Sequence, residues 1–300
     1  MERMSGGAHA GCRRSSARGA CFTGMFTPTG DAAALTTAGH LQKQRVPVTV
    51  RFSNSDGNPQ VPDSAPVTRG MAVRFHLPDG RSTDLLGITV PVFVASTPAE
   101  FVGLTEALRP DPGSGGTWGT GHPDMGRVQA FVGAHPHLAG PIMQQPPIPE
   151  SYGRTAFWAI HAFLWVDADG RKQAVRYRWE PAAGRSELTA EEAAGRAPDY
   201  LTVELHERLA RGRVTFMLYV QLAEDDDPTH DPTVAWPEER KELTAGWLEL
   251  TGPVDDQGHW EGERFDPTRV TGGIELSDDP VLAFRSFAYA ESFHRRSEKA

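Results

Sequence analysis

A period of two between apolar and polar residues recurs along this chain, and this pattern constrains its fold more than any other feature. In residues 46–53, apolar side chains alternate with polar ones, so that Arg51 and Ser53 share one face. Residues 214–222 alternate in the same way. Such alternation is typical of a β-strand. The polar face of residues 46–53 either meets solvent, which is the usual case, or lines a polar pocket.

Eight segments are predicted to be strands, and most are joined by short turns. They are residues 20–26, 46–53, 71–77, 84–94, 155–166, 172–179, 214–222 and 242–251. The helical segments occur in groups instead of alternating with strands, which argues against a parallel doubly wound sheet. We therefore expect an α+β protein built on an eight-stranded antiparallel β-barrel with appended helices. A barrel of this size encloses a core or one ligand.

Helix-capping patterns place several helices outside these strands. Residues 97–100 form a capping box before a helix that should run to about residue 109. A second capping box at residues 189–192 begins a pair of helices that ends at residue 212. Asp279 followed by Pro280 indicates an N-cap and a first-turn proline, so a helix should begin there. A short helical stretch is also expected over residues 32–41.

The domain organisation follows from length and composition. The chain has 300 residues, of which 39% are hydrophobic, enough to bury a sizeable core. We expect a single domain over residues 1–300, with residues 1–12 disordered. Residues 111–151 are rich in Gly and Pro and are expected to form a long excursion with one short helix near residues 126–132.

Charge and hydropathy exclude some partners. The formal net charge is −9, so no basic surplus exists to neutralise the phosphates of nucleic acid or an anionic membrane. The longest apolar run, residues 157–166, is ten residues long, is interrupted by His161, and is too short to span a bilayer. No segment resembles a signal peptide, so we expect a cytoplasmic protein. Cys12 and Cys21 are expected to be free thiols.

Arg285 and Tyr289 are the first candidates for chemistry. In a helix that begins at Asp279, they lie one turn apart on the same face. A guanidinium beside a phenol favours the phenolate, and a phenolate can serve as an axial ligand of a haem iron. Taken alone, the pair is more often a half-buried tyrosine against an arginine stem.

Four stretches give this pair its context, because together they resemble the catalase family. The stretches are Ala17-Arg-Gly-Ala-Cys-Phe-Thr-Gly-Met-Phe26, Val48-Thr-Val-Arg-Phe-Ser53, Arg69-Gly-Met-Ala-Val-Arg-Phe75 with Thr83-Asp-Leu-Leu-Gly87, and Arg285-Ser-Phe-Ala-Tyr289. Their order and spacing are similar to those of the short branch of that family, the catalase-related haem peroxidases. The resemblance extends from about residue 11 to residue 296.

The resemblance implies a haem b in the barrel and a role for each matching residue. Tyr289 would be the proximal ligand of the iron, and Arg285 would keep it ionised. Arg13 and Arg51 fall at positions that bind the haem propionates, to which a fixed cation is well suited. Ser53 falls where the distal histidine of the family has its hydroxyl partner. Two further residues match aromatic rings packed on the distal side of the haem: Phe93 and Phe101.

Each of these implied roles has a purely local alternative. Arg51 could be a charge on the exposed face of a strand, and Ser53 could be a turn residue. Phe93 and Phe101 could be ordinary members of the core.

The largest departure from the family is at Ser16. The family motif is His-Ala-Arg-Gly, whereas this chain has Ser16-Ala-Arg-Gly19. A positioned base contributes about 10²–10⁴-fold to such chemistry, and a hydroxyl relays a proton without holding one near neutral pH. His9 also precedes an alanine, but its spacing to the later residues does not match. Ile88 replaces an asparagine of the large catalases, which makes a fast catalase less expected than a slow peroxidase.

Three functions are compatible with this sequence. The first is a haem peroxidase that reduces organic hydroperoxides or hydrogen peroxide with a small-molecule electron donor, with weak catalase activity at most. Ser16 and Ser53 would then be its distal catalytic residues. The second is a haem-binding carrier or sensor that has lost the chemistry, and the third is rearrangement of a fatty-acid hydroperoxide. A homo-oligomer is compatible with each of them.

Overall fold

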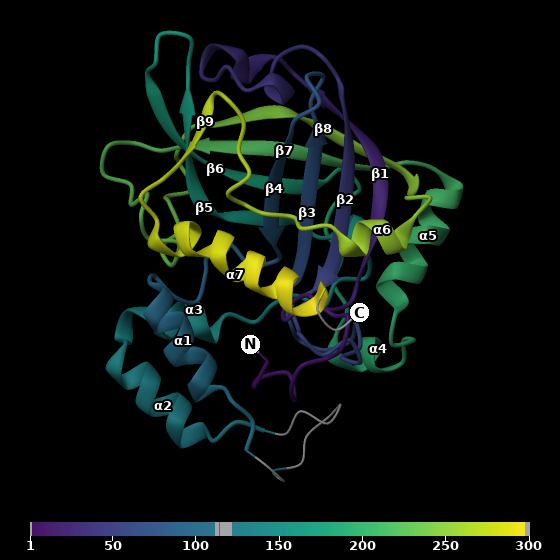
Figure 1. Ribbon diagram of the computed structural model, residues 1–300, viewed down its shortest axis with the longest axis vertical. Helices are drawn as coiled ribbons and strands as arrows, with labels where there is room; N and C mark the ends of the chain where they lie inside the picture. Colours follow the sequence, from purple (N-terminus) through teal and green to yellow (C-terminus); the bar gives the residue numbers. More distant parts are fainter. Residues whose placement is uncertain (1, 112–113, 115–121, 298–300) are drawn as a thin grey trace.

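The structure, a computed structural model, describes residues 2–111, 114 and 122–297. Within these residues, nine strands form one antiparallel sheet in the order β4-β3-β2-β1-β8-β7-β6-β5-β9. A pairing between Ile88 of β4 and Trp158 of β5 closes the first eight strands into a barrel (Figure 1). The predicted α+β class and the eight-stranded antiparallel barrel are confirmed.

All eight predicted strands occur in the barrel. They are β1 (Gly19–Pro28), β2 (Val46–Asn54), β3 (Arg69–His76), β4 (Ser82–Ile88), β5 (Phe157–Val166), β6 (Lys172–Pro181), β7 (Val214–Leu222) and β8 (Glu242–Pro253). The short β9 (Ile274–Leu276) was not predicted and pairs with β5 outside the barrel closure. Three residues are too few to show a period of two, so this strand has no recognisable sequence pattern.

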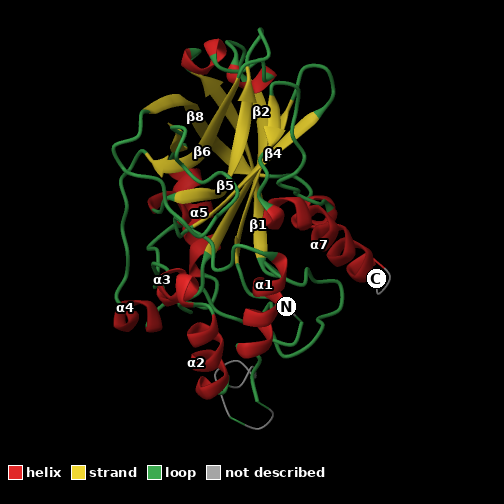
Figure 2. Cartoon of the chain, turned by 90° about the vertical axis from the view of Figure 1, so that its left-hand side faces the viewer, coloured by secondary structure: helices red, strands yellow, loops and turns green. Residues whose placement is uncertain are grey.

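The α-helices of the described residues are α1 (Pro98–Ala107), α2 (Met125–Ala134), α3 (Ala139–Met143), α4 (Ala190–Ala194), α5 (Tyr200–Arg211), α6 (Gln257–Gly262) and α7 (Pro280–Ser297). Helices α1 to α4 lie toward one end of the barrel, and α5 and α7 lie on different sides of it (Figure 2). In Figure 1, α7 crosses in front of the barrel, with α1 to α3 below it and α6 near its C-terminal end. None of the helices that the structure describes is both long and apolar enough to cross a membrane.

The predicted capping boxes are present, with reciprocal hydrogen bonds at Thr97 with Glu100 and at Thr189 with Glu192. The expected helix over residues 32–41 is wrong, because only two short 3₁₀ turns form, at Asp31–Ala34 and Gly39–Leu41. Tertiary hydrogen bonds compete with a helix in this segment. The Thr36 hydroxyl donates to the carbonyl of Gly273 at 2.6 Å, and the Thr37 N–H donates to the carbonyl of Val166 at 3.0 Å.

The strand expected over residues 84–94 ends early, at Ile88. The next residue, Thr89, accepts a hydrogen bond through its hydroxyl from the N–H of Arg69 at 3.0 Å. Phe93 then donates its N–H to the carbonyl of Pro232 at 2.8 Å, which carries the chain away from the sheet.

The two segments expected to lack regular structure are only partly described. Residues 112–113 and 115–121 of the Gly/Pro-rich excursion lie outside the described residues, and the rest of it holds α2 and α3. Residues 2–12 follow a path of turns in which the Ser5 hydroxyl accepts from the N–H of Gly57 at 3.1 Å. Their disorder in solution stays a prediction.

The barrel interior is an aromatic core. Phe26 and Phe75 meet edge to face with ring centroids 5.2 Å apart, and Phe52 stacks on Tyr152 at 4.9 Å. The opposite face of β2 is also buried, with Thr49, Arg51 and Ser53 at most 4% exposed. The alternation in this strand therefore separates an apolar interior from a second, polar buried layer and not from solvent.

Asp84 joins that outer layer to the barrel. Its carboxylate accepts from Arg74 Nε at 2.9 Å, from Arg269 Nη1 at 2.8 Å and from the N–H of Asp266 at 2.9 Å. Arg74 also stacks on the ring of Phe265 at 4.8 Å. One buried carboxylate thus fixes the segment that runs from α6 toward α7.

We predict that Asp84→Asn destabilises the protein by about 3–5 kcal/mol, because it leaves two guanidinium groups beside an amide that cannot compensate their charge. Chemical denaturation followed by circular dichroism measures this change. Asp79→Asn, which removes an exposed pair with Arg81, is the control. Equal losses in the two variants would contradict the assigned role of Asp84.

Candidate functional site

The first half of the candidate site lies on α7. Asp279 begins the helix, and its Oδ1 accepts from the N–H groups of Val281 at 2.8 Å and Leu282 at 3.1 Å. One turn separates Arg285 from Tyr289, and Arg285 Nη2 donates to the phenol oxygen of Tyr289 at 2.6 Å. The structure therefore brings together the arginine and the phenol that the sequence singled out.

A buried histidine stands behind this pair. Arg285 Nη1 lies 2.9 Å from Nε2 of His161 on β5, and His161 Nδ1 lies 2.6 Å from Oδ2 of Asp279. Arginine only donates hydrogen bonds, so Nε2 must accept and Nδ1 must carry the proton that is donated to Asp279. The four residues form one hydrogen-bonded chain, Asp279, His161, Arg285 and Tyr289, in which Arg285 donates both to His161 and to Tyr289.

The protonation of His161 agrees with this assignment. Its side chain is almost fully buried, and burial lowers its pKa to about 4. The carboxylate of Asp279 opposes this shift, and the charge of Arg285 adds to it. At neutral pH the imidazole is therefore neutral, which is the form that can accept a hydrogen bond from Arg285.

Ser16 and Ser53 lie in the segment where β1 begins and on β2. Ser16 has a φ of 57°, the one non-glycine residue of the described chain with a positive φ. Its N–H donates to the carbonyl of Ser55 at 3.3 Å, and its carbonyl accepts from Arg51 Nη2 at 3.0 Å. Ser53 is buried and is paired in register with Gly19.

His9 does not reach this segment in the contacts described. Its Nε2 lies 3.1 Å from the carbonyl of Ser5, within the same N-terminal turns.

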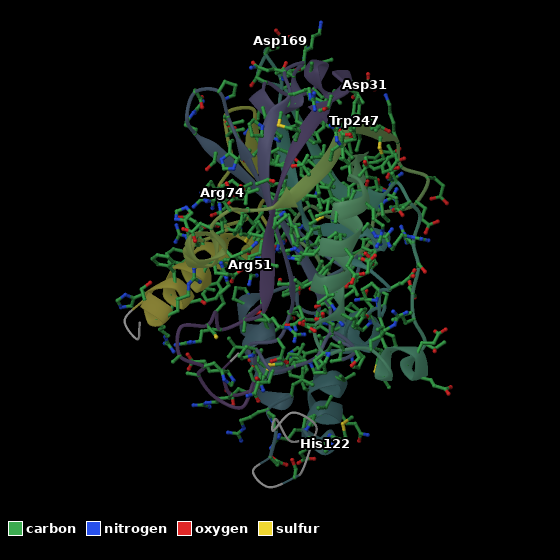
Figure 3. The ribbon with its side chains drawn as sticks, turned by 90° about the vertical axis from the view of Figure 1, so that its right-hand side faces the viewer. Asp31, Arg51, Arg74, His122, Asp169 and Trp247 are labelled. Atoms are coloured by element: carbon green, nitrogen blue, oxygen red, sulfur yellow. The ribbon has the colours of Figure 1, made fainter. Side chains whose placement is uncertain are left out.

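Arg13 and Arg51 converge on a carboxylate of the chain itself. Arg51 Nε and Nη2 donate to Glu261 of α6 at 2.7 and 3.0 Å, and Arg13 Nη1 pairs with the same carboxylate. Burial and the like charge of Arg51 lower the pKa of Arg13 to about 10. Figure 3 shows Arg51 beside the yellow C-terminal part of the chain.

Arg296 completes this arginine cluster. Its Nη2 donates to the carbonyls of Gly262 at 2.9 Å and Glu263 at 3.1 Å, and Arg13 Nη2 donates to the same Glu263 carbonyl at 2.8 Å. Sequence reasoning missed Arg296, although it follows Tyr289 by two helical turns and so shares its face. It also missed Glu261, because α6 was not predicted.

A glycine makes the cluster possible. A Cβ at Gly19 would lie 2.6 Å from the guanidinium carbon of Arg51 and 2.4 Å from the carbonyl oxygen of Phe52. No side chain fits in that space, so the motif needs glycine where Arg51 crosses β1.

Phe93 and Phe101 form a tilted ring pair with centroids 5.3 Å apart. Phe93 also lies 6.4 Å from the ring of His161. The structure thus sets this aromatic pair beside the hydrogen-bonded chain that ends at Tyr289.

Comparisons with known proteins show what the chain is similar to. The family model described as Catalase matches residues 11–299. The chain is 42% identical to a catalase-related peroxidase of Mycolicibacterium paratuberculosis, over 98% of this chain and 92% of the relative. It is 33% identical to a catalase-related peroxidase of Synechococcus elongatus, over 97% and 85%. The chain belongs to the catalase family.

Solved catalases share the fold. A bacterial catalase superposes with a TM-score of 0.84 and 24% identity over 96% of this chain. Catalase A of Saccharomyces cerevisiae superposes with a TM-score of 0.83 and 23% identity over 95% of it. The chain spans only 58% and 61% of the lengths of these two chains.

Catalase-family proteins bind haem, and the donor groups of this chain fit that cofactor. Tyr289 offers a phenol oxygen that already receives a hydrogen bond from a guanidinium, which is the environment of an anionic oxygen ligand. The arginine cluster already holds a carboxylate, that of Glu261, which shows that its geometry suits carboxylates. Tyr289 would hold the iron, and Arg13, Arg51 and Arg296 would face the propionates.

We predict that His161 makes the stability of the fold sensitive to acid. The pKa of His161 is about 4 in the folded protein and 6.5 in the unfolded chain. Its contribution to the free energy of unfolding is therefore complete above pH 6.5 and is lost as the pH falls toward 4. The loss should be about 3 kcal/mol. The free energy of unfolding is measured with denaturant at pH 7 and at pH 4. The difference in this free energy between the wild type and His161→Gln should be smaller at pH 4 by this amount. If the free energies of unfolding of the wild type and His161→Gln changed equally with pH, the prediction would be contradicted.

Proposed function

We propose that this chain is a haem-dependent peroxidase that reduces organic hydroperoxides or hydrogen peroxide. The observation that carries the proposal is the chain of hydrogen bonds from Asp279 through His161 and Arg285 to Tyr289. Membership of the catalase family, with relatives named catalase-related peroxidase, supports an oxidoreductase that acts on peroxide. We propose haem b as the cofactor and a small molecule as the electron donor.

The residues of α7 and β5 set the proximal side of the site. When bound, haem supplies the redox-active iron at which a hydroperoxide is reduced at the expense of a donor. Arg285 favours the phenolate of Tyr289 by donating to its oxygen. Neutral His161 holds Arg285 in place, and the carboxylate of Asp279 fixes the tautomer of His161.

The distal side offers hydroxyl groups in place of a histidine. Ser16 and Ser53 can relay a proton, but neither holds one near neutral pH, so a contribution of about 10²–10⁴-fold is missing from this position. We therefore propose slow peroxidase activity with weak catalase activity at most. His9 is a weak substitute, because its ring is bonded within its own segment.

A second candidate function is a haem-binding carrier or sensor without catalysis. Ser16 is the observation that favours it, because the proximal contacts serve binding equally well. A cytoplasmic location is a further proposal that rests on the sequence alone, and a homo-oligomer is compatible with either function.

Tyr289→Phe tests the ligand assignment. Removing the phenol oxygen should abolish the spectrum of a high-spin ferric haem with a phenolate ligand, since no oxygen remains to bind the iron. Absorption spectra of the haem-loaded wild type and variant measure this effect. An unchanged phenolate spectrum in the variant would refute the assignment of Tyr289.

Ser16→His tests the distal position and separates the two candidate functions. The introduced imidazole should raise peroxide-dependent donor oxidation about 10²-fold or more, because it supplies the missing base. Steady-state assays measure the rates, with Ser15→His as the matched control that places the same group one residue away. Equal rates in the wild type and Ser16→His would show that this position does not limit turnover. If the haem-loaded wild type oxidised no donor in the presence of peroxide, the second candidate function, haem binding without catalysis, would be favoured.

A further inference from the structure

Within residues 2–111, 114 and 122–297, the arginine cluster contains more positive charge than the carboxylates paired with it neutralise. Arg13, Arg51 and Arg296 provide three guanidinium groups, and among the described residues Glu261 provides the one carboxylate paired with Arg13 and Arg51. Glu263, two residues away, directs its carboxylate to Arg74 at 2.7 Å instead. Three cations and one anion leave a surplus of two positive charges, which equals the charge of the two carboxylates of a porphyrin diacid.

Glu261 binds Arg51 in a way that leaves one end of the guanidinium available. The carboxylate takes Nε and Nη2, and the Ser16 carbonyl takes the second hydrogen of Nη2. Among the contacts of the described residues, Arg51 Nη1 has no partner, although the side chain is only 4% exposed. A buried guanidinium whose orientation is fixed on one side and free on the other is arranged to receive an anion from outside the chain.

The position of Glu261 is itself set by β1. Gln257 begins α6 and binds the backbone of Cys21 twice, accepting from its N–H at 2.9 Å and donating to its carbonyl at 2.7 Å. Cys21 is the residue directly opposite Arg51 in the pairing of β1 with β2. Glu261 follows Gln257 by one helical turn, so both side chains lie on the same face of α6. This face points toward β1 and β2, where Glu261 contacts Arg51.

From these contacts we propose that Glu261 is a positioning residue, which orients Arg51 and Arg13 for the two carboxylates of the porphyrin. This inference rests on the proposed function, since it deepens the recognition of the same cofactor. Glu261 touches the arginines and not the ligand. Its amide analogue would leave Arg51 Nε and Nη2 without their charged acceptor, and the guanidinium would lose its fixed orientation.

The test measures the binding of two porphyrins by the wild type and by three variants. Wild type, Glu261→Gln, Glu261→Asp and Glu180→Gln are titrated with iron protoporphyrin IX and with its dimethyl ester, which lacks the free carboxylates. Binding is followed by absorption. Glu261→Gln should weaken binding of the diacid about tenfold, with no change for the ester, because the effect acts only through carboxylate recognition. Glu180→Gln, which removes a carboxylate paired with Arg178 and Arg185 outside the cluster, is the matched control and should bind both porphyrins as the wild type does.

Glu261→Asp separates positioning from charge. It keeps the negative charge but withdraws it by one methylene group, so it should lose diacid affinity nearly as Glu261→Gln does. Full affinity in Glu261→Asp would overturn the positioning role and leave only a role in charge balance. This variant also keeps the test decisive if Glu261→Gln does not fold.

The remaining outcomes are equally decisive. Tighter diacid binding by Glu261→Gln would mean that Glu261 competes with the porphyrin, and unchanged binding would mean that it has no role; each overturns the proposal. Equal losses for diacid and ester would assign Glu261 to the stability of the fold. Failure of the wild type to bind either porphyrin would instead refute the proposed function, and is distinguishable from all of these.

Discussion

The hydrogen bond between Arg285 and His161 is the contact on which the candidate site depends. It joins α7 to β5 across 124 positions of the sequence. Apolar burial does little to place this helix, because among its described residues only Val281, Leu282 and Arg296 are buried. The helix is therefore positioned mainly by polar contacts, and these require one protonation state of one buried imidazole.

Further polar contacts support the same arrangement along α7. Ser286 donates to the carboxylate of Asp266, and Ser292 accepts from the N–H of Arg14. Asp266 in turn donates its N–H to Asp84, the buried carboxylate that anchors the outer layer on β3 and β4. The orientation of Tyr289 thus depends on a network that reaches the sheet, so loss of a single buried charge in it is expected to disturb both stability and the site.

Much of the fold could be predicted because its signals are local. Strands β2 and β7 alternate over seven or more residues, and α1, α4 and α7 begin at side chains that cap them. Tyr289 and Arg285 were found for the same reason, since their contact is one helical turn long. His161 was visible only as a polar interruption in an apolar run, because its role exists only once β5 lies beside α7. Glu261 needed α6, whose six residues include two glycines and give almost no periodic signal.

The backbone at Ser16 bears on the distal role proposed for this residue. Its left-handed conformation, with φ of 57°, is uncommon for a residue other than glycine, and histidine occurs there more readily than most side chains. The backbone is held from both sides, by the Ser55 carbonyl and by Arg51, and neither contact involves the serine hydroxyl. A histidine could therefore occupy this position without a change of local fold. Under the proposed function, the difference between a peroxidase and a carrier then lies in one side chain, on a backbone that Arg51 already ties to the arginine cluster.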